Sequence, residues 1–314
     1  LADRYGKILL ISMPFWNLQF AFQMFFVTAE KPKLGLYVTL LAGFANILLD
    51  ALFVAVFDMG LIGAALATGI SQIVGGGVPL LYFFRRNTSL LHLGRTRFVL
   101  KPFLKGTSNG LSEFVNGVSG SLVSILYNTQ LLRYAGEDGV AAYGIMMYIT
   151  LVCIGISFGY ANGTSPIIGY HYGAKNTSEL RSLLRKSVVI TFAAAVLMVL
   201  TAELFAAPFA AVFAGYDAAL CALTTRGLRI FATSFFFSGF AIFGSSFFTA
   251  LNNGPVSALL STLRTLVFQV VTALVLPAFW GVDGIWISLS LAEALAALAS
   301  GICIFALRKK YKYM

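Results

Sequence analysis

Long apolar stretches alternate with short polar segments along the whole of this chain of 314 residues. A helix crosses the hydrocarbon core of a bilayer, about 30 Å thick, in roughly 20 residues. Nine stretches reach that length: 7–27, 35–57, 60–84, 103–131, 138–166, 187–213, 228–250, 255–278 and 284–307. Because lipid offers no partner for backbone polar groups, each is expected to be a helix. The pattern predicts an all-α polytopic membrane protein.

Positive charge follows the same alternation. Most of the 22 Lys and Arg residues lie in four polar segments, 31–33, 85–105, 175–186 and 308–312. The other turns that join consecutive apolar stretches hold few of them. Loops rich in Lys and Arg face the cytoplasm in membrane proteins. We therefore expect a protein integral to the plasma (cytoplasmic) membrane, of bacterial type, with its carboxyl terminus in the cytoplasm.

Composition agrees with this class, because 59% of the residues are hydrophobic and only 11% are charged. The net charge of +10 could attract nucleic acid, but the positive residues flank apolar stretches and form no basic, aromatic-interleaved face. The lipid bilayer is therefore the expected partner, and nucleic acid is not. The three cysteines, Cys153, Cys221 and Cys303, show neither disulfide nor metal spacing, so we expect no cofactor.

The polar segment between the third and fourth stretches suggests a division of the chain. We predict three helices in 1–84, a cytoplasmic linker in 85–102, and six helices in 103–314. Gly60 and Gly63 recur as Gly281 and Gly284 at the same spacing of 221 residues, which is either chance in a glycine-rich chain or an internal repeat. Two equal repeats of six helices would make twelve. On that reading, three further helices are expected before residue 1.

Polar residues inside an apolar span are costly, so each is a candidate site. Asp50 lies about as many residues before the turn that joins its span to the next as Thr68 lies after that turn, so the two residues share a depth in the membrane. Asn46 is one helical turn from Asp50, and Gln72 one turn from Thr68. These oxygens could hold a hard cation such as Na⁺, or form a carboxyl site for H⁺. A hydrogen-bond network without an ion is the alternative.

The second half of the chain offers three ionisable candidates. Glu113 and Arg264 each lie about ten residues into a span from the predicted cytoplasmic side, so an ion pair between them is possible. That pair could belong to the transport pathway or be purely structural. Glu293 has packing or transport as alternative roles. The phenylalanines of 231–248 encircle their helix, and a subset could form an aromatic pocket for lipophilic cations.

Several segments resemble the multidrug and toxic compound extrusion (MATE) transporters. They are 46–53 (NILLDALF) with 60–68 (GLIGAALAT), 166–176 (PIIGYHYGAKN), and 281–286 (GVDGIW) followed by Glu293, with Arg264 upstream. The resemblance implies two lobes of six helices. It also implies that Asp50, Asn46 and Thr68 belong to a cation site in the amino-terminal lobe, with Gln23 or Asn17 completing it. Glu30-Lys31 and Thr164-Ser165 depart from the family pattern.

The function predicted from these observations is secondary active transport by a monomer. Na⁺ or H⁺ would enter in exchange for small amphipathic cationic drugs or toxins, which leave by alternating access. A flippase for lipid-linked oligosaccharides has a similar architecture and is the alternative within transport, although its pyrophosphate cargo would favour a more cationic interior. An intramembrane enzyme or a structural membrane protein is the alternative from another class. The sequence has no H-E-x-x-H, and its two His residues, His92 and His171, lie outside the predicted spans, so no enzyme is expected.

Overall fold

The computed structural model describes residues 2–85, 89, 91, 93–94, 98–311 and 313, without the side chains of 2, 4, 102, 105 and 108–116. The described elements are helices. In chain order they are α1 (Ala2–Thr28), α2 (Pro32–Asp50), η1 (Ala51–Val56), α3 (Gly60–Phe84), α4 (Leu100–Gly173), α5 (Thr177–Ala214), α6 (Ala218–Ala250), α7 (Gly254–Thr262), η2 (Leu263–Phe268) and α8 (Gln269–Tyr311). Here η marks a π-helical segment. The all-α fold class is confirmed.

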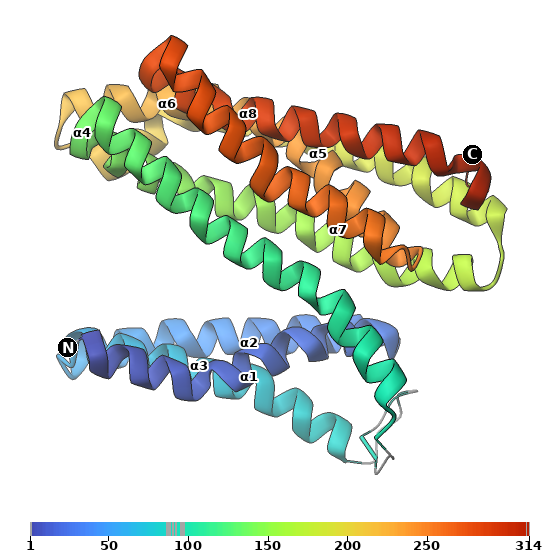
Figure 1. Cartoon of the computed structure of the whole chain (residues 1–314). Coiled ribbons are helices and arrows are strands. Elements are labelled where there is room, and N and C mark those ends of the chain that lie inside the picture. Colours follow the sequence, from blue (N-terminus) through green and yellow to red (C-terminus); the bar gives the residue numbers. More distant parts are fainter. Residues whose placement is uncertain are drawn as a thin grey trace. The chain divides into compact units, whose positions relative to one another are not determined.

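The chain divides into two compact units, Leu1–Phe98 and Val99–Met314. The first unit holds α1, α2 with η1, and α3, which run up and down beside one another (Figure 1). Its core is aromatic: Phe22 stacks on Phe83 with 5.5 Å between ring centroids, and Phe26 packs against the same ring at 5.0 Å. This cluster ties the carboxyl-terminal end of α1 to that of α3.

Close approach of α1 and α3 depends on glycine. A Cβ atom added to Gly76 would overlap the backbone carbonyl of Phe15, whereas one added to Gly77 would meet nothing within 4 Å. Small residues let membrane helices approach in this way. Position 76 therefore requires glycine for packing, and position 77 does not.

The second unit contains two helices much longer than a bilayer requires. Seven helices in the described chain are long and apolar enough to span a membrane, and two of these spans have 57 and 58 residues. Such a length is about 85 Å of straight helix, far more than one crossing needs. Each reverses direction at a glycine with positive φ, Gly136 (φ 65°) in α4 and Gly281 (φ 56°) in α8, and Figure 1 shows both returns.

The count of nine separate helices was therefore wrong as a count of continuous elements. The predicted breaks at 131–138 and 278–284 coincide with Gly136 and Gly281. A single left-handed residue turns the chain there, because glycine has no Cβ to oppose positive φ. Hydrogen bonding resumes at once, so no separate loop forms.

The core of the second unit is centred on α6, whose Phe231, Phe235 and Leu228 are each no more than 1% exposed. Trp286 of α8 and Met146 of α4 pack against them. Apolar side chains elsewhere on these helices point outward, such as Leu151 and Leu204, both more than 70% exposed. Such surfaces suit a lipid environment.

The recurring glycine pairs occupy equivalent turns. Gly60 (φ 52°) opens α3 and Gly281 (φ 56°) opens the last crossing of α8. Gly63 packs against the preceding helix, because an added Cβ would lie 3.0 Å from the carbonyl oxygen of Phe53. A Cβ on Gly284 would overlap the carbonyl of Leu276 in the same manner. The repeated pair of glycines in the sequence therefore corresponds to a repeated turn in the backbone.

Candidate functional site

Asp50 lies where helix type changes. It is the last residue of α2, and the π-helical segment η1 follows it directly. Short π-helical segments within α-helices occur frequently at functional sites. The Asp50 side chain is half-buried, and in the part of the chain that the structure describes no hydrogen bond or ion pair engages its carboxylate. A carboxylate so placed is available to bind a cation or a proton.

Asn46 lies one turn before Asp50 on the same face of α2. Its Nδ2 atom is buried and has no hydrogen-bond partner among the described residues. Leaving a buried amide donor unpaired costs about 1–3 kcal/mol. The pair of residues therefore presents two polar groups that the surrounding protein does not satisfy.

Thr68 and Gln72 of α3 behave differently from each other. Thr68 is half-buried, and among the described residues its hydroxyl has no hydrogen bond. The amide oxygen of Gln72 accepts a hydrogen bond of 2.6 Å from the hydroxyl of Ser12, a buried residue of α1. Gln72 thus links α3 to α1, and the structure shows no hydrogen bond from it to Asp50.

Gln23 is also engaged elsewhere. Its Nε2 donates to the hydroxyl of Thr39 on α2 at 2.7 Å, and that hydroxyl donates to the carbonyl of Gly35. Thr39 is two helical turns before Asn46. Asn17, the alternative to Gln23, donates to the carbonyl of Met13 on its own helix. Neither Ser12 nor Thr39 could be expected as a partner from the sequence, because a lone hydroxyl in an apolar helix does not reveal which residue it faces.

Asp50, Thr68 and Asn46 carry oxygens of the kind that hard cations take: a carboxylate, a hydroxyl and an amide oxygen. Among the described residues no group of three or more His, Cys, Asp or Glu comes together. The chemistry of Asp50, Asn46 and Thr68 fits Na⁺ or a titrating carboxyl.

A buried ion pair lies in the second unit. The Nε atom of Arg264, in η2, donates to both carboxylate oxygens of Glu293 at 2.8 and 3.1 Å. The two side chains are 10% and 4% exposed. In the described part of the chain Arg264 therefore pairs with Glu293. The sequence had predicted packing or transport as alternative roles for Glu293, but not this pair. The side chain of Glu113, on α4, lies outside the described residues, so its pairing with Arg264 stays a prediction.

Hydroxyl groups close to this pair were not anticipated. The Tyr127 and Ser288 hydroxyls are 2.8 Å apart, and Ser288 donates to the carbonyl of Ile285, so Tyr127 is the donor between the two. The Tyr127 ring stacks on Tyr143 with 5.7 Å between centroids. This network joins α4 to the last crossing of α8. The sequence does not reveal this contact, because a tyrosine in an apolar stretch does not indicate which residue its hydroxyl group contacts.

Three phenylalanines of α6 line an apolar cavity, Phe237, Phe240 and Phe243. The cavity has a volume of about 950 Å³ and is bounded by α5 and α8 as well. Phe231, Phe235, Phe247 and Phe248 are instead buried in the core. The stretch thus divides between packing and an aromatic cavity.

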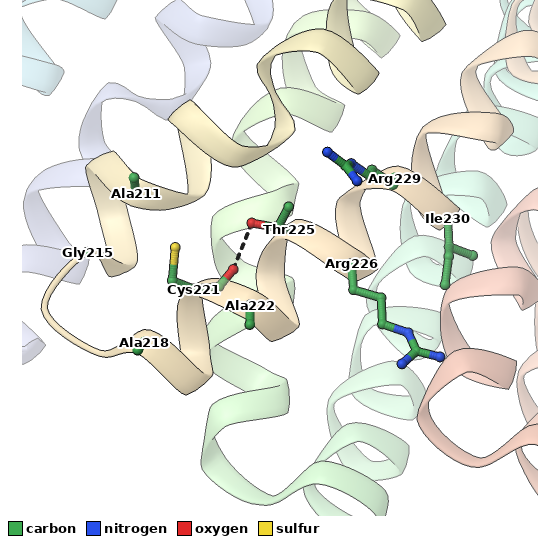
Figure 2. A pocket seen from close by; sticks show the side chains of 9 residues that line it. All are labelled: Ala211, Gly215, Ala218, Cys221, Ala222, Thr225, Arg226, Arg229 and Ile230. Carbon is green, nitrogen blue, oxygen red and sulfur yellow. Dashed lines mark hydrogen bonds between the residues drawn. The ribbon is translucent and has the colours of Figure 1, made fainter.

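A second pocket, of about 830 Å³, lies between α5 and α6 (Figure 2). Arg226 and Arg229 line it. Arg226 forms an ion pair with Asp283, and Arg229 lies 3.9 Å from Glu203. Both arginines are therefore matched by a carboxylate, and the pocket does not present an excess of positive charge.

Long apolar helices with a few polar groups among them are the features of an integral membrane protein. A family model described as MatE matches residues 114–275, more than half of the chain. The chain belongs to the MatE family. The expected transporter class is confirmed, and the protein is not an enzyme.

The relatives are bacterial exporters. The multidrug export protein MepA of Staphylococcus saprophyticus is 25% identical over 313 residues, covering 98% of this chain and 67% of the relative. MepA of Staphylococcus aureus is 24% identical over 314 residues, covering 99% of this chain and 68% of the relative. These relatives and the spanning helices indicate a protein of the bacterial plasma membrane.

Solved structures share the fold. A MATE protein in complex with MaL6 has a TM-score of 0.92 at 22% identity, covering 99% of this chain and 70% of the other. An outward-facing multidrug resistance MATE family transporter of the MOP superfamily also has a TM-score of 0.92, at 23% identity, covering 100% of this chain and 70% of the other.

Proposed function

We propose that the protein exports small amphipathic cationic compounds in exchange for Na⁺ or H⁺. The MatE family and the two MepA relatives, which carry the name of multidrug exporters, support export of drugs. The aromatic cavity beside α6 supports lipophilic cations as cargo, because aromatic faces attract cations.

Asp50 carries the coupling part of the proposal. A carboxylate inside an apolar span costs several kcal/mol unless it binds a cation or a proton. Asp50 is half-buried at the junction of α2 and η1, beside the unpaired amide of Asn46. Binding of Na⁺ or H⁺ at Asp50, with Thr68 and Asn46 as further oxygen donors, would neutralise that charge. An ion that binds one conformation better than another shifts their populations, and this is the basis of coupling.

The two units supply candidates for the moving parts. We assign residues 1–84 to an amino-terminal lobe and 103–314 to a carboxyl-terminal lobe, with 85–102 as the linker; several linker residues lie outside the described chain. The lobes would alternate access to the two sides of the membrane while the protein acts as a monomer, with its carboxyl terminus in the cytoplasm.

A flippase for a pyrophosphate-linked cargo is less well supported. It would need unmatched positive charge along its path. Arg264, Arg226 and Arg229 each lie beside a carboxylate in the structure. These pairs favour a cationic over an anionic cargo.

Transport by inverted membrane vesicles tests the proposal. In inverted vesicles an exporter carries its cargo into the lumen, so the coupling ion must be more concentrated inside the vesicle than outside. With such a gradient of Na⁺ or H⁺, we expect vesicles that contain the full-length protein to accumulate ethidium, and vesicles without the protein to accumulate none. Uptake that is unaffected by either gradient would contradict ion coupling. Uptake of an anionic dye in preference to ethidium would contradict the cationic cargo.

A further inference from the structure

A small pocket lies at one end of the second unit, where α4 ends, α5 begins and α8 ends. Its volume is about 260 Å³, and its lining includes His171, Tyr172, Lys175, Lys310 and Tyr311. Lys310 follows Leu307, the end of the apolar stretch, by three residues, which is about 5 Å along a helix. The headgroup layer extends roughly 5–8 Å beyond the hydrocarbon core. The pocket is therefore at the height of lipid headgroups.

The pocket carries positive charge that the protein does not neutralise. Lys175 and Lys310 are exposed, and within the described ranges neither forms a salt bridge. The Lys310 ammonium lies 5.3 Å from the centre of the Tyr311 ring. The acid nearest in sequence, Glu179, is exposed and does not line the pocket. An anion would supply the missing countercharge.

Directional polar groups accompany the charge. The Nδ1 atom of His171 is buried and has no hydrogen-bond partner among the described residues. Thr177, at the first position of the 38-residue helix α5, also lines the pocket. The amino-terminal end of a helix attracts anions through its dipole. The N–H groups of Thr177 and Glu179 already donate to the carbonyl of Lys175 and to Oδ1 of Asn176, so the dipole is the contribution of α5 here. A phosphate group suits this combination, because it accepts several hydrogen bonds and carries charge.

Aromatic packing holds the wall of the pocket in place. Tyr311 packs on Tyr172 at 5.7 Å and stacks on Tyr313 at 6.1 Å. The buried Tyr313 hydroxyl donates to the carbonyl of Ile304 at 2.8 Å. Burial raises the pKa of Tyr313 to about 12, so it stays an uncharged phenol beside the pocket at physiological pH. The site is thus formed before any ligand binds.

We propose that this pocket binds the phosphate of an anionic phospholipid from the adjoining leaflet. The shared chemistry is a phosphate group, and its position decides the source. Ile302 and Phe305 precede Lys310 on α8 by eight and five residues, are 68% and 59% exposed, and belong to the lining of the aromatic cavity beside α6. They offer an apolar surface for the acyl chains of the same lipid molecule, which a free phosphate ion would not use. The phosphate pocket is separate from Asp50 and shares no lining residue with the aromatic cavity, whereas the acyl-chain surface is part of that cavity.

Native mass spectrometry of the purified full-length protein with phosphatidylglycerol tests the site. Lys175→Ala/Lys310→Ala removes both pocket charges. Lys186→Ala/Lys309→Ala is the matched control, because these exposed lysines lie at the same membrane surface but not in the pocket. General attraction to anionic lipid should fall equally in the two variants.

The pocket variant is expected to retain the lipid at least about tenfold less than the control variant, from the loss of two charges near the headgroup. Lys175→Arg/Lys310→Arg should restore retention, and all three variants should give the gel-filtration profile of the unmodified protein. Equal retention by the pocket and control variants would overturn the site. Thermal stabilisation by inorganic phosphate, with none by phosphatidylglycerol, would overturn the lipid as its source.

Discussion

Arg264 and Glu293 are two charged groups held inside an apolar helix bundle. Their exposed fractions of 10% and 4% mean that both have lost most of their hydration. The two hydrogen bonds from one guanidinium nitrogen offset that loss only while both partners are present. Removing one partner leaves an uncompensated charge, and this makes the pair a sensitive test of packing in the second unit.

Glu293→Gln is expected to lower the stability of the folded protein by about 3–5 kcal/mol, the usual cost of breaking a buried pair. Glu203→Gln is the control, because Glu203 is 40% exposed and 3.9 Å from Arg229, and exposed pairs contribute about 0–1 kcal/mol. Thermal unfolding in detergent, followed by the loss of the monodisperse peak in gel filtration, measures both. Equal losses in the two variants would show that the Arg264–Glu293 pair is not buried as described.

The candidate residues themselves could be predicted from sequence, and their partners could not. Asp50 and Glu293 stand out because an acid in an apolar run is rare. Ser12 and Thr39 do not stand out, since hydroxyl groups are common in membrane helices and usually donate to a backbone carbonyl of their own helix. Only the packing of α1 on α2 and α3 shows that they take up the amides of Gln72 and Gln23.

At the scale of elements, the run Gly75–Gly77 on α3 shows three different uses of one residue type. Gly75 faces the side chain of Gln19, Gly76 faces the backbone of Phe15, and Gly77 faces open space. A side chain can move aside, but the backbone of a packed helix cannot do so without moving the whole helix. The contact between α1 and α3 therefore depends chiefly on Gly76.

Gly76→Ala is expected to separate α1 from α3 and lower stability by about 1–3 kcal/mol, the cost of overpacking. Gly77→Ala should leave stability unchanged or raise it slightly, because alanine favours helix by up to about 1 kcal/mol over glycine. The melting temperature of the purified variants compares the two. A lower melting temperature for Gly77→Ala than for Gly76→Ala would contradict the close approach.

The helices could be located from apolar length alone, but the sequence could not show that a single residue makes two of their junctions. One residue of positive φ reverses the chain at Gly136 and at Gly281. Apolar length likewise carries no sign of the π-helical segments η1 and η2, which the structure places beside Asp50 and around Arg264.

At the scale of the whole molecule, each unit turns apolar side chains outward and gathers small and aromatic ones inward. That arrangement follows from composition, since 59% hydrophobic residues exceed what two small cores can hold. How the units are arranged around a substrate does not follow from the apolar pattern, because that pattern is the same on every lipid-facing helix. Sidedness, in contrast, is predicted by the distribution of Lys and Arg.

Cysteine labelling in intact cells tests the sidedness. In a background with Cys153, Cys221 and Cys303 replaced, Asp58→Cys should react with a membrane-impermeant maleimide from outside. Lys309→Cys should react only after permeabilisation, because its segment holds four positive residues in 308–312. Both positions are exposed. The reverse pattern would invert the orientation.

The central claim is that Asp50 couples export to an ion, and one comparison tests it most directly. Asp50→Asn keeps the volume of the side chain but can neither take up H⁺ nor hold Na⁺ by charge. Asp58→Asn is the matched control, since Asp58 is exposed in a turn at φ 49°, a conformation that asparagine tolerates. Thr68→Ala, which removes a neutral oxygen, should have an intermediate effect.

The measurement is gradient-driven ethidium transport in vesicles that contain equal amounts of folded protein. We predict that Asp50→Asn abolishes the gradient-dependent component while Asp58→Asn retains the unmodified rate. Transport by Asp50→Asn at the unmodified rate would contradict the coupling site and leave Asp50 as a packing residue.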